Sequence, residues 1–148
     1  MADRVLLATA DHPPSTERVA RDLAEIESTD TTVSLVYVFD DADLESTRRN
    51  LNLDGRTVNA DELASRKEDV VQAKSVLDDA GIDYEVVGKV EDDRATAVLD
   101  AAADANANRI YVYSEGRNPV GKAVFGSDLQ DIIRWSTVPV IVTPDGAA

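Results

Sequence analysis

Short apolar runs alternate with longer amphipathic stretches along the whole chain. Five runs have the length and composition of buried strands: residues 4–8, 32–39, 84–90, 110–113 and 138–143. Between them, apolar residues recur every three or four positions, as they do in helices that pack one face on a core. This alternation predicts the α/β class, as a three-layer α/β/α sandwich with a five-stranded parallel sheet and right-handed crossovers.

Four of the amphipathic stretches predict helices. They comprise a segment that starts at a cap on Ser15 or Thr16 and runs through Ile26, and residues 61–80, 94–107 and 127–136. Gly81 directly follows the second of these helices, where glycine permits a left-handed cap. Residues 40–60 are polar and predict a mobile surface loop with at most one helical turn, near the ligand edge of the sheet.

The length and the absence of certain residue types narrow the class of protein. A chain of 148 residues with 43% hydrophobic residues predicts a single domain over residues 1–148 with a sizeable core. No apolar run is long enough to cross a membrane, and the first residues do not have the pattern of a signal peptide. Because there is no cysteine, disulfides, thiolate nucleophiles and zinc–thiolate sites are excluded. These features favour a cytoplasmic protein.

The charge balance bears on the partners. The chain has 29 acidic and 15 basic residues and a net charge of −14, spread along its length. A field of that sign repels nucleic acid and anionic membranes, so neither is expected as a partner. Lysine is scarce, with only four residues. A dispersed acidic surface of this kind is typical of proteins adapted to high salt, which screens the self-repulsion.

The stretch from Gly116 to Ser127 is the main candidate for ligand binding. It follows the apolar run 110–113 and precedes a helical pattern, so it predicts a strand, a glycine-marked loop and a helix start. Exposed amides and the helix dipole at such a start favour an anion, and glycine allows close approach to the backbone. The alternative is that Gly116 and Gly126 only turn the chain.

A P-loop is one way to interpret these residues. Gly116 to Ala123 reads G-x-x-x-x-G-K-A, in which Lys122 would reach the terminal phosphates. The pattern lacks the hydroxyl that should hold Mg²⁺, because Ala123 stands where Ser or Thr is required. It also comes late in the chain, whereas a P-loop normally follows the first strand of its domain. The sequence therefore disfavours a P-loop phosphohydrolase.

The same residues resemble the universal stress protein family. Gly116 is followed after nine residues by Gly126-Ser127, and the chain then continues to Val-Pro-Val-Ile-Val at 138–142, as in the C-terminal end of that family. The resemblance implies the sheet order 3-2-1-4-5 and an adenine nucleotide, ATP (with Mg²⁺) or AMP, whose phosphates rest on Gly126 and Ser127 with Arg117 as a nearby cation. It also implies a homodimer through the C-terminal strand.

The resemblance assigns two more residues to the nucleoside. In the family, the first strand ends in an acid that meets adenine and ribose; counting from one side places Asp11 there, and counting from the other places Ala10 there. The residue that matches Val38 touches adenine through its backbone. Asp11 follows the apolar run 4–8, and Val38 lies near the end of the run 32–39. The carboxyl ends of parallel strands are where such sheets bind ligands. We therefore expect Asp11 and Val38 to lie at the ligand edge.

Three departures from the family pattern suggest an alternative function. Tyr113 replaces the first glycine of the motif, where its ring is expected to crowd the ribose and phosphates. Asp128 places a carboxylate beside the first amides of the last helix, and the acids 91–93 replace a glycine between the third strand and its helix. The alternative is a dimeric protein-interaction module without nucleotide binding. The single histidine, His12, is expected to be solvated, and no acid–base pair indicates an enzyme.

Overall fold

The structure is a computed structural model that describes residues 3–50, 59–114, 116–117, 123–124 and 126–144. Five parallel strands form the main sheet in the order β3-β2-β1-β4-β7. The strands are β1 (Arg4–Ala8), β2 (Thr32–Phe39), β3 (Asp83–Val90), β4 (Arg109–Tyr113) and β7 (Val140–Thr143). The predicted fold class and the strand order 3-2-1-4-5 are therefore confirmed.

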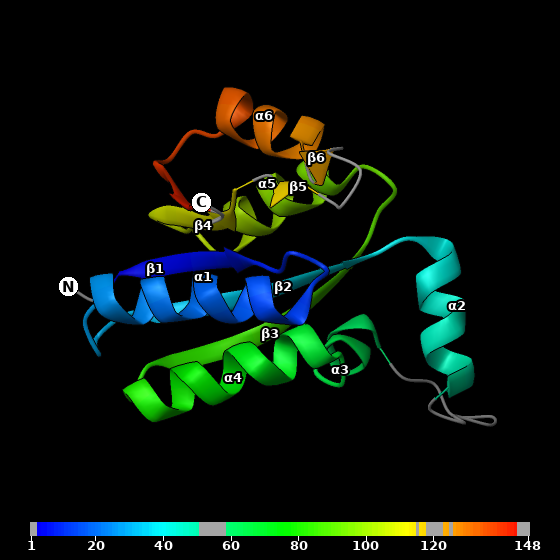
Figure 1. The fold of residues 1–148 in the computed structure, drawn as a ribbon, viewed down its shortest axis with the longest axis horizontal. Helices are drawn as coiled ribbons and strands as arrows, with labels where there is room; N and C mark the ends of the chain where they lie inside the picture. Colours follow the sequence, from blue (N-terminus) through cyan, green and yellow to red (C-terminus); the bar gives the residue numbers. More distant parts are fainter. Residues whose placement is uncertain (1–2, 51–58, 115, 118–122, 125, 145–148) are drawn as a thin grey trace.

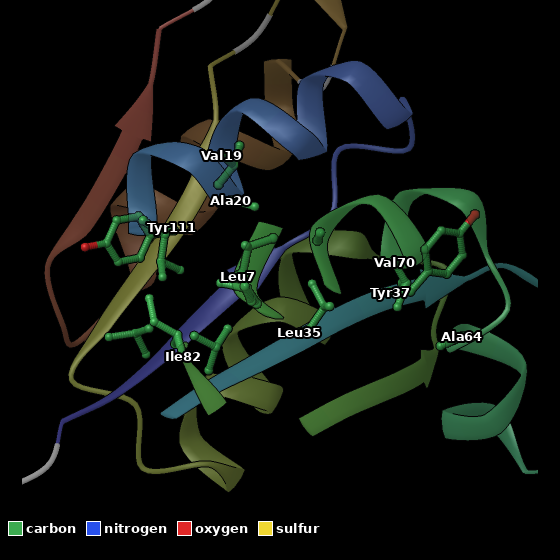
Figure 2. Packing of buried hydrophobic residues seen from close by; sticks show 14 of the residues in the cluster. Leu7, Val19, Ala20, Leu35, Tyr37, Ala64, Val70, Ile82 and Tyr111 are labelled. Carbon is green, nitrogen blue, oxygen red and sulfur yellow. The ribbon is translucent and has the colours of Figure 1, made fainter. Parts of the chain in front are cut away.

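Helices cover both faces of this sheet (Figure 1). Helices α1 (Pro13–Ile26) and α4 (Glu68–Ala80) pack on one face, and α5 (Arg94–Asp104) and α6 (Gly126–Trp135) pack on the other. Neighbouring strand residues point to opposite faces, so Leu7 enters the α1–α4 cluster and Leu6 enters the α5–α6 cluster. Figure 2 shows Leu7 packed among side chains of the first cluster. Burial on both faces explains why the strands are continuous apolar runs.

Helix α1 begins three or four residues earlier than the sequence pattern indicates. His12 is its N-cap, and Pro13 and Pro14 occupy the first positions, where a missing N–H costs nothing. Ser15 and Thr16, which the sequence indicates as caps, lie inside the first turn and are buried. Thr16 instead turns its hydroxyl oxygen toward the end of β1.

The segment 40–60 differs from the predicted loop. Residues 41–50 form a ten-residue helix, α2 (Asp41–Asn50), and residues 51–58 lie outside the described part. Asp40 starts the helix, because its carboxylate accepts a hydrogen bond of 2.7 Å from the amide of Asp43. The acids expected in a surface loop are thus the cap and first turn of a helix, where they suit the dipole.

The predicted helix 61–80 is divided in two. A short helix, α3 (Ala60–Ala64), precedes α4, and Gly81 ends α4 in the expected left-handed conformation with φ 71°. Helix α3 lies against the end of β3, where a Cβ on Gly88 would sit 2.1 Å from the carbonyl oxygen of Ala60. Glycine is required at position 88 because a backbone, not a ligand, approaches it there.

A short antiparallel pair precedes the last helix. Strand β5 (Gly116–Arg117) pairs with β6 (Ala123–Val124), and α6 begins at Gly126. Lys122 lies outside the described residues. A P-loop needs a helix that starts near Lys122, and residues 123–124 form a strand instead. The P-loop interpretation is therefore wrong.

Candidate functional site

A cavity of about 480 Å³ opens at the carboxyl ends of β1 and β2. Helix α2 lines one side of it, and the turn between β3 and α5 lines another. The charged side chains that line it are five acids and two cations: Asp11, Asp40, Asp43, Glu91 and Asp92, with Lys67 and Arg94. Acceptors thus outnumber cations, and the cavity suits a ligand that presents hydrogen-bond donors.

Asp11 enters this cavity from a strained loop that α4 holds in place. Its φ of 55° is left-handed, which aspartate tolerates better than most residues. On either side of it, the His12 amide donates to Asp69 Oδ2 at 2.9 Å, and the Ala10 amide donates to Thr16 Oγ1 at 2.9 Å. The Thr16 hydroxyl donates in turn to Asp69 Oδ2 at 2.5 Å. Asp69 therefore fixes both flanks of Asp11 from a different helix.

The carboxyl of Asp69 is itself in an environment that disfavours its charge. Asp69 is buried, and burial raises the pKa of its carboxyl, although the hydrogen bonds from Thr16 and from the His12 amide oppose the rise. Sequence reasoning did not single out Asp69. It stands next to Val70 in an amphipathic pattern and gives no signal of a contact across 57 residues.

Tyr37 joins Asp11 to helix α2. Its hydroxyl oxygen lies 3.1 Å from Asp11 Oδ1 and 3.0 Å from Asp43 Oδ2. The Lys67 ammonium lies 3.2 Å from Asp43 Oδ1 and 5.2 Å from the centre of the Tyr37 ring. Burial, together with the charges of Asp11 and Asp43, raises the pKa of Tyr37, so its hydroxyl keeps its proton.

Arg94 links the cavity to the start of α6. A guanidinium nitrogen lies 3.8 Å from Asp11 Oδ2. The half-buried Asp128, in the first turn of α6, also feels this cation: burial raises the pKa of Asp128, Arg94 lowers it, and Asp93 and Asp131 raise it further. Arg94 therefore interacts with two carboxylates, Asp11 at the cavity and Asp128 at the start of α6.

The structure places the sequence-predicted residues as follows. Asp11 and Val38 line the same cavity. Gly116 and Arg117 form β5. Gly126 and Ser127 are the first residues of α6, so their amides belong to the free N–H groups of the helix start. Of the predicted residues, Asp11 and Val38 are thus brought together in one cavity. Sequence reasoning missed Tyr37, whose alternation in β2 reads as core.

Tyr113 lies on the face of the sheet opposite α6. The ring packs against the cluster between α1 and the sheet, with the Arg18 guanidinium 5.9 Å from the ring centre. Gly126 and Ser127 begin α6, which covers the other face. The ring therefore fills the α1 layer rather than the layer that carries the start of α6.

Two buried hydroxyls mark the neighbouring strand ends. Ser114 Oγ and Thr143 Oγ1 have no hydrogen-bond partner among the described residues, although the Ser114 amide donates to the Thr143 carbonyl at 2.7 Å. Buried polar side chains are nearly always paired. This end of β4 and β7 is therefore polar without being satisfied by the described part of the chain.

The described residues do not assemble a catalytic triad around His12. Its Nδ1 lies 2.8 Å from Ser15 Oγ, but the nearby acid, Asp69, accepts from the His12 backbone and leaves the ring without an orienting acid. Within the same residues, no group of three or more His, Asp or Glu side chains is arranged to hold a metal ion. Nor does any helix in the described ranges have the length and apolar composition of a membrane span.

A parallel sheet in the order 3-2-1-4-5, with a polar cavity at the carboxyl ends of its central strands, defines a doubly wound α/β protein. The model of the universal stress protein family matches residues 1–144, and the chain belongs to that family. A comparison with curated protein sequences finds no match.

Solved structures with the same fold include nucleotide complexes. The universal stress protein from Archaeoglobus fulgidus in complex with dAMP is 22% identical, with 95% of this chain and 96% of that chain covered and a TM-score of 0.63. A family member from Arabidopsis thaliana with AMP bound is 15% identical, with 98% and 93% covered and a TM-score of 0.62. A universal stress protein in complex with cAMP is 15% identical, with 96% of each chain covered and a TM-score of 0.52. At these identities the likeness shows the fold.

Proposed function

We propose that this universal stress protein binds an adenine nucleotide, AMP or ATP, at the carboxyl end of its sheet and acts as a stress-response accessory rather than an enzyme. Asp11 accepts a hydrogen bond from the adenosine part, and the Val38 backbone lies beside the base. The phosphates rest on the free amides of Gly126 and Ser127, with Gly116 and Arg117 in the preceding hairpin. When the ligand is ATP, Mg²⁺ enters with its phosphates.

The observation that carries this proposal is the shared cavity of Asp11 and Val38, two residues 27 positions apart that the family pattern assigns to the nucleoside. The cavity carries an excess of acceptors, which suits the amino group of adenine and the hydroxyls of ribose. The solved family members with AMP, dAMP and cAMP support the same ligand class. The alternative of a family member without nucleotide binding is not favoured.

Calorimetry in molar KCl tests the proposal with AMP and Mg-ATP as probes. Valine at position 126 blocks the approach of phosphate to the helix start, so Gly126→Val should weaken binding at least tenfold, about 1.4 kcal/mol. Lys122→Ala should cost only a long-range charge effect, and Asp79→Ala, at an exposed position of α4, serves as the control. Circular dichroism first confirms that each variant folds. Failure of the wild type to bind either nucleotide would refute the proposal.

We further propose a homodimer through β7. This strand ends the sheet order, and no described strand pairs with its outer side. Val142 on it is exposed, and an open apolar edge is an aggregation hazard unless a partner covers it. Light scattering should give the mass of a dimer for the wild type and of a monomer for Val140→Asp. A monomeric wild type would overturn the dimer.

The acidic surface supports a proposal about the environment of the protein. With a net charge of −14, it is expected to work in a cytoplasm of high salt, as haloarchaeal-type acidic proteins do, where counterions screen the repulsion between carboxylates. The same charge disfavours nucleic acid as a partner. A retardation assay with duplex DNA at low salt, where electrostatic binding is strongest, should show no complex.

A further inference from the structure

The Tyr37 hydroxyl faces two acceptors with one proton. Asp11 Oδ1 is 3.1 Å and Asp43 Oδ2 is 3.0 Å from the same phenol oxygen. A protonated phenol donates one hydrogen bond, so the two carboxylates compete for it. The carboxylate that does not receive this hydrogen bond faces the lone pairs of the tyrosine oxygen, which repel it. Any group that donates to Asp11 relieves this competition and leaves the proton to Asp43.

The two competing carboxylates belong to different parts of the molecule. Asp11 is 60% exposed and faces the cavity, whereas Asp43 stands in the first turn of α2 and is 31% exposed. Helix α2 stands apart from the helices that cover the sheet (Figure 1). Asp43 joins this helix to the rest of the protein through two polar contacts, with the Tyr37 hydroxyl and with the Lys67 ammonium. The hydrogen bond from the Tyr37 hydroxyl to Asp43 is therefore one of the contacts that hold this helix against the sheet.

We propose that Tyr37 couples occupancy of the cavity to the docking of helix α2. A ligand amino or hydroxyl group that donates to Asp11 turns the Tyr37 O–H fully toward Asp43, and α2 is then held more tightly against the sheet. The O–H only rotates; no covalent bond changes. The inference rests on the proposed function for the identity of the ligand, and it adds that a donor facing Asp11, rather than occupancy alone, moves the helix.

The substitution Asp11→Asn tests the coupling without any ligand. Asparagine tolerates the left-handed backbone at this position, and its amide can donate to the Tyr37 oxygen, so that residue 11 no longer competes with Asp43 for the Tyr37 proton. Hydrogen exchange of the α2 amides should therefore slow by about fivefold, the effect of one ordinary hydrogen bond. If Asp11 served only to hold the loop, the substitution would leave α2 unchanged or loosen it. Unchanged or faster exchange overturns the proposal.

Two tyrosine variants identify the route. In a Tyr37→Phe background, which keeps the buried ring, Asp11→Asn should leave α2 exchange unaltered. Tyr84→Phe is the matched control, because Tyr84 also has its hydroxyl beside an aspartate, Asp78, but does not line the cavity. In the Tyr84→Phe background, Asp11→Asn should still slow the exchange of α2. Slowing that survives in Tyr37→Phe, or disappears in Tyr84→Phe, contradicts a relay through Tyr37.

The second arm uses AMP as the probe. Saturating AMP should slow α2 exchange in the wild type by the same factor, and Tyr37→Phe should show no slowing at AMP concentrations that calorimetry shows to saturate the variant. Binding of AMP to the wild type without any change at α2 overturns the coupling. If AMP does not bind, the proposed function fails on its own, while the ligand-free result with Asp11→Asn still decides the coupling.

Discussion

A buried tyrosine lies at each end of the sheet, and the two hydroxyls differ in their hydrogen-bond partners. At the amino end, the Tyr111 hydroxyl donates to Glu27 Oε2 at 2.5 Å, and Arg109 binds both oxygens of Glu27, at 2.9 and 2.6 Å. At the carboxyl end, the Tyr37 hydroxyl lies between the carboxylates of Asp11 and Asp43. Figure 2 shows the two tyrosines at opposite ends of one apolar cluster, with their hydroxyls pointing away from it.

The balance of donors and acceptors separates the two ends. Burial raises the pKa of Glu27, but hydrogen bonds from Arg109, Tyr111 and Thr31 outweigh it, and the pKa is lowered below its ordinary value. Burial raises the pKa of Asp69 at the carboxyl end, and its hydrogen bonds do not offset the rise. The amino end is therefore built for stability, and the carboxyl end keeps charges that a ligand can satisfy. Four predictions test this contrast.

The largest expected effect is at the amino end. Glu27→Gln removes the charge and turns an amide N–H₂ toward the donors Arg109 and Tyr111, so it should lower the free energy of unfolding by about 3 kcal/mol, the cost of breaking a buried ion pair. Because the pKa of Glu27 is lowered, its stabilisation is complete above the ordinary pKa and is lost as the pH falls through the lowered one. Urea unfolding at pH 7 and pH 3 should show the gap between variant and wild type shrink in acid. A gap of equal size at both pH values would contradict this account.

The next effect is at the carboxyl end. Gly88→Ala places a Cβ 2.1 Å from the Ala60 carbonyl oxygen, so α3 must shift, and Lys67, which follows it, shifts as well. We expect a loss of about 2 kcal/mol in unfolding free energy, within the range for overpacking. Gly81→Asn is the control, because asparagine tolerates the left-handed φ of 71°. Equal losses in the two variants would remove the special role of Gly88.

The hydrogen bonds to Asp69 should give an effect of similar size, with a dependence on pH opposite to that of Glu27. Asparagine can accept from the His12 amide and the Thr16 hydroxyl through Oδ1, whereas alanine leaves both donors unpaired, so Asp69→Ala should be less stable than Asp69→Asn by roughly 2 kcal/mol. The raised pKa means that the cost of the Asp69 charge appears as the pH rises from the ordinary pKa to the raised one.

Unfolding curves from pH 3 to 7 check this sign. Asp69→Asn should match the wild type in acid and equal or exceed its stability at neutral pH. A wild type that gains stability over Asp69→Asn as the pH rises would show that the carboxylate is stabilising and that the sign is wrong.

Salt should produce the smallest change, and an uneven one. Between low and molar KCl, screening of the net charge of −14 should raise the unfolding midpoint by about 3 °C, roughly 1 kcal/mol for a chain of this size. Hydrogen exchange should slow more in the loop around Asp11 and in α2 than around the paired Glu27. A midpoint independent of KCl would rule out the salt requirement, and equal slowing at both ends would remove the contrast.

The sequence predicts the layers of the fold because its periodicities follow burial directly. Strands such as β2, residues 32–39, are apolar on both faces, and only a sheet covered on both sides accommodates them. The predicted secondary structure is wrong where a polar residue is equally compatible with a loop and with a helix cap. Asp40 and the acids after it read as a loop, and the choice between solvated turn and helix cap depends on one hydrogen bond from the Asp43 amide.

The candidate site was predictable only where a family pattern names positions. Asp11 and Val38 come from that pattern, and both line the cavity. Tyr37 could not be found, because in β2 it has the spacing of a core residue and its ring is indeed buried. Its function lies in one oxygen atom at the end of that ring. Asp43 and Lys67 were missed because nothing in their sequence spacing shows that they meet.

The left-handed backbone at Asp11 also limits how this position can change over generations. At a φ of 55°, most side chains are strained, and glycine, asparagine and aspartate are the residues that adopt it readily. Glycine removes the acceptor and asparagine adds a donor, so each tolerated replacement alters the chemistry that Asp11 presents to the cavity. Few substitutions at this position therefore preserve both the stability of the fold and the chemistry of the cavity. A saturation library should retain stability for these three residues alone, and its survivors should differ in how they bind ligand.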